Sequence, residues 1–317
     1  MCGISGFNFQ NRDLIEKMNE RIKHRGPDQS GIFLDDNISL GHRRLSIIDL
    51  SEKGRQPLFN EDKSLCIVFN GEIYNFQELR RDLEKKGHRF YSKTDSEVIL
   101  HLYEDYKEGC LEFLNGIFAF AIWDTKNKEL FLARDRIGVK PLYYYWGPST
   151  GSGRTKDFIF SSEIKAILEH DIKREINLDA VNYYFRLMYV PAPLTMFKNI
   201  YKLPQAHYLK LKDNKIEIKP YWDIKDFSNI ESREEIIGKI HDLMRQSVRG
   251  QLISDRPVGV FLSGGIDSTS VLGVAREFKK DKIKHIKNVR INYKTNENVM
   301  YSFFIENNKI YVEVKDY

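Results

Sequence analysis

Cysteine is scarce in this sequence of 317 residues, and long apolar runs and blocks of like charge are missing from it. The three cysteines, Cys2, Cys66 and Cys110, are odd in number and show no CxxC spacing, which argues against a disulfide framework and against a zinc site. Neither an apolar run of about eighteen residues nor a leader pattern is found, so we expect a cytoplasmic protein without a membrane partner. The net charge is +5, and without a basic block it gives no reason to expect nucleic acid as a partner.

The rest of the composition is typical of a globular protein with room for two domains. Hydrophobic residues make up 41% of the chain and aromatic residues 13%, which is enough for packed cores. A cluster of prolines marks a domain boundary, and its members are Pro191, Pro193, Pro204 and Pro220. We therefore expect a first domain at 1–190, a linker at 191–230, the start of a second domain at 231–281 and a divergent tail at 282–317.

The first 190 residues alternate between helical and strand patterns. Apolar residues recur at helical spacing in 14–22, 76–83 and 98–103. Short apolar or alternating runs predict strands at 31–34, 38–41, 65–69, 118–123, 129–133, 141–145 and 158–160. Many sequential strands with flanking helices predict an α+β sandwich of two stacked antiparallel sheets. Thr94–Glu97 has the spacing of a capping box, and Ser161 or Ser162 is a candidate cap for the following helix.

Beyond the prolines, the sequence predicts the start of a parallel α/β domain. Ser232–Glu235 is a second capping box, and it precedes a helix with one apolar face. Pro257–Leu262 has the pattern of a short strand, and a glycine loop and a helix ending near Phe278 follow it. Further on, 289–293 and 310–314 alternate like strands, with a turn at 306–309.

Cys2 lies directly behind the first methionine, and removal of Met1 would make it the N-terminal residue. It would then carry a thiol and a free α-amine whose pKa of about 8 suits a base that activates the thiol. The alternative for Cys2 is a small buried residue without reactivity. That alternative is the one we expect for Cys66, which lies inside an apolar strand.

Asn70–Gly71 is a second candidate for chemistry, because it directly follows an apolar strand. The side-chain amide of Asn70 and the backbone N–H of Gly71 are two donors of the kind that stabilise an oxyanion. Asn-Gly is also a common tight-turn dipeptide, so the pair by itself leaves a simple turn open.

Taken together, these motifs resemble the glutamine-dependent asparagine synthetases, a branch of the glutamine amidotransferases whose nucleophile is N-terminal. The matching segments are Met1–Gly6, His24–Asp28, Arg43–Asp49, Phe69–Tyr74, Thr94–Leu100, Asn115–Asp124, Ala133–Tyr143 and Ser161–Leu168. The fold that this resemblance implies is the N-terminal-nucleophile hydrolase sandwich.

The resemblance also implies roles for single residues. Cys2 would attack glutamine, with Asn70 and Gly71 as the oxyanion donors. Glutamine would be bound by Arg44 at its α-carboxylate and by Glu72 and Asp95 at its amine end. From the residues alone, Arg44 could equally be a solvated charge, Glu72 a turn residue and Asp95 an acid that the dipole favours at a helix N-terminus.

The glycine loop resembles the pyrophosphate loop of ATP pyrophosphatases. Its expected contacts with ATP and pyrophosphate are Leu262, Ser263, Gly264, Gly265, Asp267 and Ser268. Glycines expose successive N–H groups, and the next helix presents its positive N-terminus to phosphate. The loop lacks the Gly-Lys-Ser/Thr ending of a Walker loop. The resemblance implies ATP as a cofactor, with Mg²⁺ near Asp267, whereas glutamine hydrolysis needs none.

The family's activity would combine ammonia from glutamine with an adenylated aspartate, so glutamine, aspartate and ATP are the expected partners. The chain ends soon after the loop and its tail does not resemble the family, so we expect an incomplete ligase half. A homodimer or a complementing C-terminal synthetase chain could supply the remainder. A stand-alone glutaminase or non-ligating subunit, and an amidotransferase for another acceptor, stay open.

Overall fold

The computed structural model describes residues 1–224, 232–263, 265–279, 291–294, 299–306 and 309–316. The chain divides into two compact units, Met1–Phe227 and Ser228–Tyr317.

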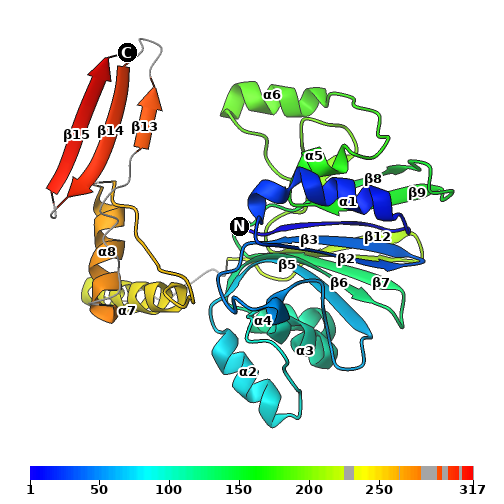
Figure 1. Cartoon of the computed structure of the whole chain (residues 1–317), viewed down its shortest axis with the longest axis horizontal. Coiled ribbons are helices and arrows are strands. Elements are labelled where there is room, and N and C mark those ends of the chain that lie inside the picture. Colours follow the sequence, from blue (N-terminus) through cyan, green and yellow to red (C-terminus); the bar gives the residue numbers. More distant parts are fainter. Residues whose placement is uncertain (225–231, 264, 280–290, 295–298, 307–308, 317) are drawn as a thin grey trace. The chain divides into compact units, whose positions relative to one another are not determined.

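Two six-stranded antiparallel sheets stack on each other in the first unit (Figure 1). The first sheet has the order β10–β8–β9–β1–β3–β2, and its strands are β1 Gly3–Phe7, β2 Gln29–Asp35, β3 Ile38–Arg44, β8 Tyr143–Pro148, β9 Lys156–Ser161 and β10 Ile200–Lys202. The second has the order β12–β11–β7–β6–β5–β4, and its strands are β4 Leu58–Phe59, β5 Leu65–Ile73, β6 Gly116–Asp124, β7 Glu129–Arg134, β11 His207–Lys212 and β12 Lys215–Pro220.

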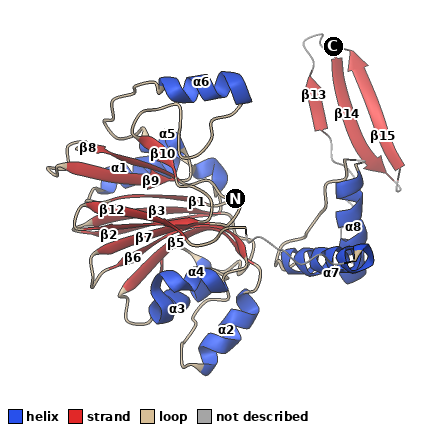
Figure 2. Ribbon diagram, turned by 180° about the vertical axis from the view of Figure 1, so that it is seen from behind, coloured by secondary structure: helices blue, strands red, loops and turns tan. Residues whose placement is uncertain are grey.

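Helices lie on the outer faces of both sheets (Figure 2). Helices α1 (Arg12–Arg21) and α5 (Ile164–Ile167) contact the first sheet, and α3 (Glu97–Tyr106) contacts the second. The remaining helical segments of this unit are α2 Phe76–Lys85, α4 Cys110–Phe113, α6 Leu178–Leu187 and the short 3-10 turns η1 Lys23–Arg25, η2 Glu52–Gly54 and η3 Lys107–Gly109. The predicted sandwich of two antiparallel sheets flanked by helices is confirmed.

The core between the sheets fixes where the polar side chains of the strand ends lie. Ile4 of β1, Leu40 of β3 and Val68 of β5 are fully buried in this layer. Because side chains alternate along a strand, every second residue before and after these also points between the sheets. Cys2, Arg44 and Asn70 are placed by this alternation at one end of the sandwich.

Two of the predicted helix caps are wrong. Helix α3 begins at Glu97, and its N-cap Ser96 makes no side-chain cap; the Glu97 carboxylate instead accepts the N–H groups of Tyr91 and Ser92, each at 2.9 Å. Ser161 and Ser162 do not cap α5 either. Their hydroxyl groups bind the carbonyl and the N–H of Ile4, at 3.1 and 3.0 Å, and so anchor β1 beside β9.

The expected linker at 191–230 is also wrong. This segment contains β10, β11 and β12, and β11 pairs with β7 in the second sheet. Pro220 ends β12 at the sheet edge, where a residue without an N–H group is tolerated. The proline cluster therefore belongs to the sandwich.

The second unit starts with α7 (Arg233–Gln251), and its capping box is confirmed because the side chains of Ser232 and Glu235 each bind the other's backbone. Helix α8 (Ile266–Phe278) contacts α7 through an ion pair between Arg245 and Glu277 at 2.9 Å. None of the residues of α7 is buried, and Leu243 on its apolar face is 64% exposed.

The strand predicted at Pro257–Leu262 is not formed, because within the described residues this segment pairs with no other strand. A three-stranded antiparallel sheet follows instead, with β13 Ile291–Lys294, β14 Val299–Glu306 and β15 Lys309–Asp316. Both predicted strand regions of the tail fall in it, whereas 289–290 and 307–308 lie outside the described residues.

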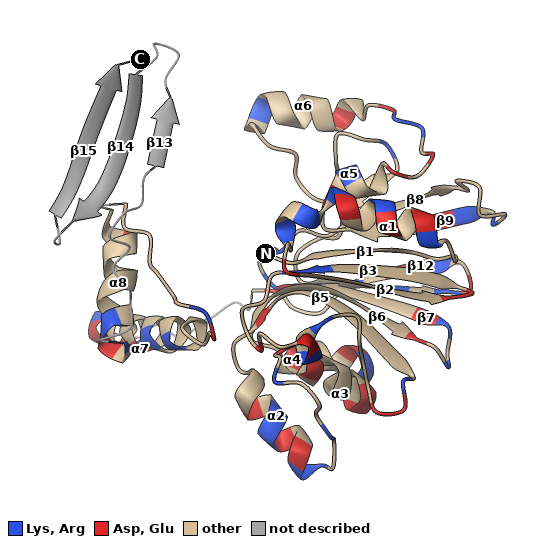
Figure 3. Cartoon of the chain, in the orientation of Figure 1, with Lys and Arg blue, Asp and Glu red and all other residues tan. Residues whose placement is uncertain are grey.

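On the first unit, charges of both signs alternate along α1 and α2 (Figure 3). Arg12 pairs with Glu16 on α1, and Lys85 pairs with Asp82 on α2. Among the helices in the described part of the chain, none is long and apolar enough to cross a membrane.

Candidate active site

Cys2 lies at the beginning of β1, the strand between β9 and β3. Its carbonyl accepts a hydrogen bond from Arg25 Nε at 2.9 Å, and Arg25 Nη1 is itself paired with Glu163 at 3.1 Å. The Cys2 sulfur accepts the N–H of Leu45 at 3.4 Å. Backbone and side chain of Cys2 are thus both held by neighbouring segments.

The surroundings of Cys2 favour the thiol over the thiolate. Burial raises its pKa, although the hydrogen bond from Leu45 opposes this shift. A thiol in this state needs a base before it can act as a nucleophile. The nitrogen of Cys2 is an amide while Met1 is attached, and an amide nitrogen is not basic.

A cavity of about 120 Å³ opens beside Cys2. All six residues assigned to glutamine chemistry from the sequence line it, namely Cys2, Arg44, Asn70, Gly71, Glu72 and Asp95. They come from the residue before β1, from β3 and β5 and from the loop before α3, so the fold brings together residues up to 93 positions apart, from Cys2 to Asp95. The cavity has the size of a small metabolite and not of a polymer.

Asn70 contributes an amide that the protein itself leaves unused. The residue is 1% exposed, and neither Nδ2 nor Oδ1 has a hydrogen-bond partner among the described residues. Buried polar atoms are nearly always satisfied, so an unsatisfied pair that lines a cavity indicates a site for a ligand. The donor Nδ2 is the one that suits an oxyanion.

The N–H of Gly71 is a second available donor. Phe118 lies opposite Gly71 on β6. The N–H of Phe118 donates to the Asp135 carboxylate and its carbonyl accepts the N–H of Asp135, so both groups point away from β5. In an antiparallel ladder, backbone groups that point away from the partner strand alternate with those that point toward it. The N–H of Gly71 therefore points away from β6, and it has no bonded partner among the described residues.

The glycine at 71 is required by the sheet itself. A Cβ atom there would lie 2.3 Å from the carbonyl oxygen of Ile117 on β6. The close neighbour of Gly71 in the structure is therefore the adjacent strand.

Arg44 is largely committed to the protein. Its Nη1 donates to Gln29 Oε1 at 2.8 Å and to Ser51 O at 3.1 Å, and its Nη2 donates to Ile48 O at 2.9 Å and to Asp49 O at 2.5 Å. Of the five N–H groups of a guanidinium, these bonds leave the one on Nε. Arg44 therefore holds residues 45–51 in place beside the cavity. A carboxylate would bind Arg44 through Nε, or by replacing one of the backbone carbonyls that now accept from the guanidinium group.

Glu72 and Asp95 place two carboxyl groups in the cavity. Burial raises the pKa of Asp95 to about 7, and the charge of Glu72 adds to this shift. Burial also raises the pKa of Glu72. Asp95 Oδ2 accepts the N–H of Ile73 at 2.9 Å, which fixes its position at the end of β5. Two buried acids that repel each other form a favourable site for a cation such as an ammonium group.

Lys140 is a cavity residue that the sequence analysis missed. It is 8% exposed, and burial lowers its pKa while the charges of Glu72 and Cys2 oppose this. The loop that carries it is built on Asp135, whose carboxylate accepts the N–H groups of Val139 and Lys140, each at 2.9 Å. The signal available in the sequence was that Lys140 lies inside the family-matching segment Ala133–Tyr143.

The profile of the glutamine amidotransferase domain family matches residues 1–222, which is most of the chain. The chain belongs to this family. A second profile, described as asparagine synthase, matches residues 239–302. The amidotransferase match covers both sheets and every cavity residue, and the second match includes α8 and the loop before it.

Relatives with curated names share both regions with this amidotransferase. A protein of Methanocaldococcus jannaschii is 43% identical over 305 residues, covering 88% of this chain and 57% of its own length. Asparagine synthetase (glutamine-hydrolyzing) 3 of Bacillus subtilis is 38% identical over 308 residues, covering 94% of this chain and 49% of its own length. The chain thus spans about half the length of the curated relatives it matches.

A solved structure supports the fold assignment. Glutamine phosphoribosylpyrophosphate amidotransferase of B. subtilis aligns with a TM-score of 0.50 at 17% identity, and the alignment covers 93% of this chain and 68% of that one. At this identity the likeness concerns the fold alone.

The glycine loop of the second unit lies at the N-terminus of α8. Ser263 Oγ lies 3.0 Å from Ser268 Oγ, and the N–H of Gly265 donates to Ser263 Oγ at 3.4 Å. Asp267 is in the first turn of α8 and Leu262 precedes the loop, whereas Gly264 lies outside the described residues. The serine hydroxyls and the helix N-terminus are thus gathered at one point, as a phosphate site requires.

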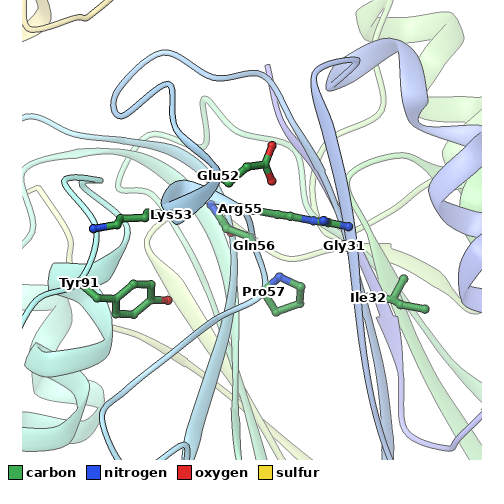
Figure 4. A pocket seen from close by; sticks show the side chains of 8 residues that line it. All are labelled: Gly31, Ile32, Glu52, Lys53, Arg55, Gln56, Pro57 and Tyr91. Atoms are coloured by element: carbon green, nitrogen blue, oxygen red, sulfur yellow. The ribbon is translucent and has the colours of Figure 1, made fainter.

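A second, more open depression in the first unit contains none of the six residues assigned to glutamine chemistry. Its lining includes Gly31, Arg55, Gln56 and Pro57 (Figure 4). Arg55 donates to the carbonyl of Ser30 at 2.8 Å, and a Cβ atom on Gly31 would meet the carbonyl oxygen of Gln56. These contacts join β2 to the neighbouring loop and have a structural role.

Proposed function

We propose that this amidotransferase hydrolyses glutamine with Cys2 as the nucleophile, after Met1 has been removed. The observation that carries the proposal is the buried amide of Asn70, which lies in the cavity that Cys2 lines and has no hydrogen-bond partner in the described part of the chain. Glutamine is a small molecule with an anionic end, a cationic end and a reactive amide, and the cavity offers a group for each.

In the proposed reaction, the thiol proton of Cys2 passes to its own α-amine, and the sulfur bonds to the side-chain carbonyl carbon of glutamine. The oxyanion is stabilised by Asn70 Nδ2–H and the N–H of Gly71. Collapse of this intermediate expels ammonia, which takes the proton, and water then hydrolyses the thioester to glutamate. Glu72 and Asp95 bind the α-ammonium group, and Arg44 binds the α-carboxylate or positions the loop that does.

The test is glutamate release by the Cys2→Ala variant, with Cys66→Ala as the matched control. Cys66 is buried in the core between the sheets, so its variant should keep the activity. Intact mass should show active protein beginning at Cys2. Glutamate release by Cys2→Ala at the parent rate, or full activity in protein that retains Met1, would refute the proposal.

The acceptor of the ammonia is proposed from the relatives. The B. subtilis relative is named an asparagine synthetase, so we propose that ammonia is transferred to aspartate activated by ATP and Mg²⁺. The glycine loop, with Ser263, Gly265, Asp267 and Ser268, would bind the pyrophosphate part of ATP. In this proposal residues 231–281 are the beginning of the synthetase domain, and residues 282–317 form a divergent tail after it.

This chain by itself is not expected to make asparagine. The glycine loop supplies a phosphate cradle, but α7 and α8 leave an apolar helix face exposed and no paired strand lies beside the loop in the described part of the unit. The purified chain with aspartate, ammonium, ATP and Mg²⁺ should produce no asparagine, AMP or pyrophosphate. A complementing synthetase chain, added separately, should restore all three; equal yields from the chain alone would show that it completes the site by itself.

A further inference from the structure

We propose that Glu61, His88, His101 and Glu104 form a binding site for a divalent transition metal, with Zn²⁺ as the best-matched ion. One oxygen or nitrogen atom of each residue lies within 4.8 Å of the others. The four residues come from the turn between β4 and β5, the loop after α2 and helix α3. None of them lines the Cys2 cavity, so the proposal is independent of the proposed reaction.

The spacing of the four inner atoms fits a tetrahedral ion. His88 Nδ1 lies 3.7 Å from Glu104 Oε2, His101 Nδ1 lies 3.6 Å from Glu61 Oε2, and His101 Nδ1 lies 2.8 Å from Glu104 Oε2. Ligands at about 2.0–2.1 Å from a tetrahedral zinc ion are separated from one another by about 3.3 Å. The separations in the cluster start at 2.8 Å and stay within 4.8 Å, so side-chain rotations that even them out would enclose the ion.

The outer atom of each histidine faces a carboxylate. His88 Nε2 is 3.1 Å from Asp105 Oδ1, and His101 Nε2 is 4.0 Å from Glu97 Oε1. A carboxylate behind a ligating imidazole is the usual arrangement in zinc sites, because it fixes the tautomer and the ring orientation. For His88 the hydrogen bond with Asp105 turns Nδ1 toward the other ligand atoms, whereas Glu97 is too far from His101 Nε2 for a hydrogen bond and contributes only its negative charge.

The outer oxygen of each glutamate is also held. Glu61 Oε1 accepts the N–H of Arg89 at 2.9 Å, and Glu104 Oε1 accepts from Asn60 Nδ2 at 2.8 Å. In each case the second oxygen points to the histidines. Four oriented ligand atoms on three segments make a more specific arrangement than a surface group of acids.

The ligand types favour zinc over the other common cations. Two imidazole nitrogens suit Zn²⁺ better than Mg²⁺ or Ca²⁺, which prefer oxygen. Once the ion has displaced the proton of His101, two carboxylates and two neutral imidazoles also balance the charge of a divalent ion. The ion would join α3 to the β4–β5 turn and would therefore stabilise the fold.

The competing occupant is a proton. Burial lowers the pKa of His101, but the hydrogen bond with Glu104 and the nearby charges of Glu97 and Glu61 outweigh this effect and raise the pKa to about 9. A cluster that only shares a proton would bind no zinc, and this difference is what the experiment measures.

The test uses the full chain with Cys2→Ala, so that the active-site thiol cannot bind the metal, after treatment with EDTA. Zinc titration by calorimetry should give one ion per chain and a higher Tm, Mg²⁺ should give neither, and Co²⁺ should give the visible absorption of a tetrahedral site. His88→Ala and Glu61→Gln should each lower zinc affinity at least about tenfold. His24→Ala is the control, because His24 is an exposed histidine paired with a single acid, Glu163.

Glu61→Gln changes a partly exposed side chain and should fold even if His88→Ala does not. Absence of stoichiometric zinc binding, or parent affinity in both His88→Ala and Glu61→Gln, would overturn the proposal and leave a proton-sharing cluster. A loss of affinity in His24→Ala equal to that in His88→Ala would also overturn it.

Discussion

Removal of the Asn70 amide should separate catalysis from stability. In Asn70→Ala the oxyanion loses one of its two proposed donors, and loss of one such donor typically lowers kcat by about 10²–10³, or about 2.7–4 kcal/mol. Because the oxyanion forms only in the transition state, KM for glutamine should change little.

The stability of the same variant should hardly change. Neither amide atom of Asn70 binds another described residue, so its removal breaks no hydrogen bond within the protein. Asn19 is the matched control, since it is also buried but its Oδ1 accepts from Ser5 Oγ at 3.1 Å and its Nδ2 donates to Gly31 O at 3.2 Å. Asn19→Ala leaves two buried groups without partners and should cost about 2–4 kcal/mol, against less than about 1 kcal/mol for Asn70→Ala.

The assays are glutamate release under saturating glutamine and urea unfolding of both variants. We expect Asn70→Ala to have a low kcat and a stability close to that of the parent, and Asn19→Ala to keep its activity but unfold at a lower urea concentration. This expectation would be refuted if Asn70→Ala kept kcat within about threefold of the parent, or if it lost as much stability as Asn19→Ala.

Two further predictions concern the charged groups of the cavity. Burial raises the pKa of Asp95 in the folded protein to about 7, whereas the unfolded chain loses this proton above pH about 4. The protonated carboxyl therefore contributes to the free energy of unfolding at low pH, and this contribution is lost as the pH rises through about 7. Asp95→Asn should therefore raise Tm more at pH 8 than at pH 5 while weakening glutamine binding, and an equal Tm change at both pH values would contradict the assignment. Arg44→Ala should weaken glutamine binding by about 2–5 kcal/mol. It should also lower Tm, because the four hydrogen bonds of the guanidinium group to the protein are lost. A KM change below about twofold would show that Arg44 neither binds glutamine nor positions the loop that does.

Local patterns in the sequence were enough to predict the sandwich and to single out Cys2 as the proposed nucleophile. Short apolar or alternating runs predicted the strands, and the alternation of side chains along a strand places Cys2 and Asn70 on the inner face. The capping box of Ser232 and Glu235 was also predictable, because its contacts span only three positions. These features depend on residues that are close in sequence.

Contacts between residues far apart in the sequence could not be predicted from local patterns, and segment 191–230 and the proposed zinc site are two examples. Prolines suggested a linker at 191–230, but pairing of β11 with β7 returns that segment to the sandwich. Cysteine spacing argued against a zinc site, whereas the proposed ligands are histidines and glutamates from three segments.

The sequence alone determined which residues are chemically competent: a thiol at position 2, an amide at 70 and acids at 72 and 95. The tertiary structure decided what state they are in. The N–H of Gly71 points away from β6 and has no partner among the described residues, because Phe118 binds Asp135 instead. Arg44 is committed to the carbonyls of its own loop, and Asp95 has a raised pKa because it is buried beside Glu72. Hydrogen-bond partners and pKa values depend on groups that lie close in space but far apart along the chain, so no local pattern contains them.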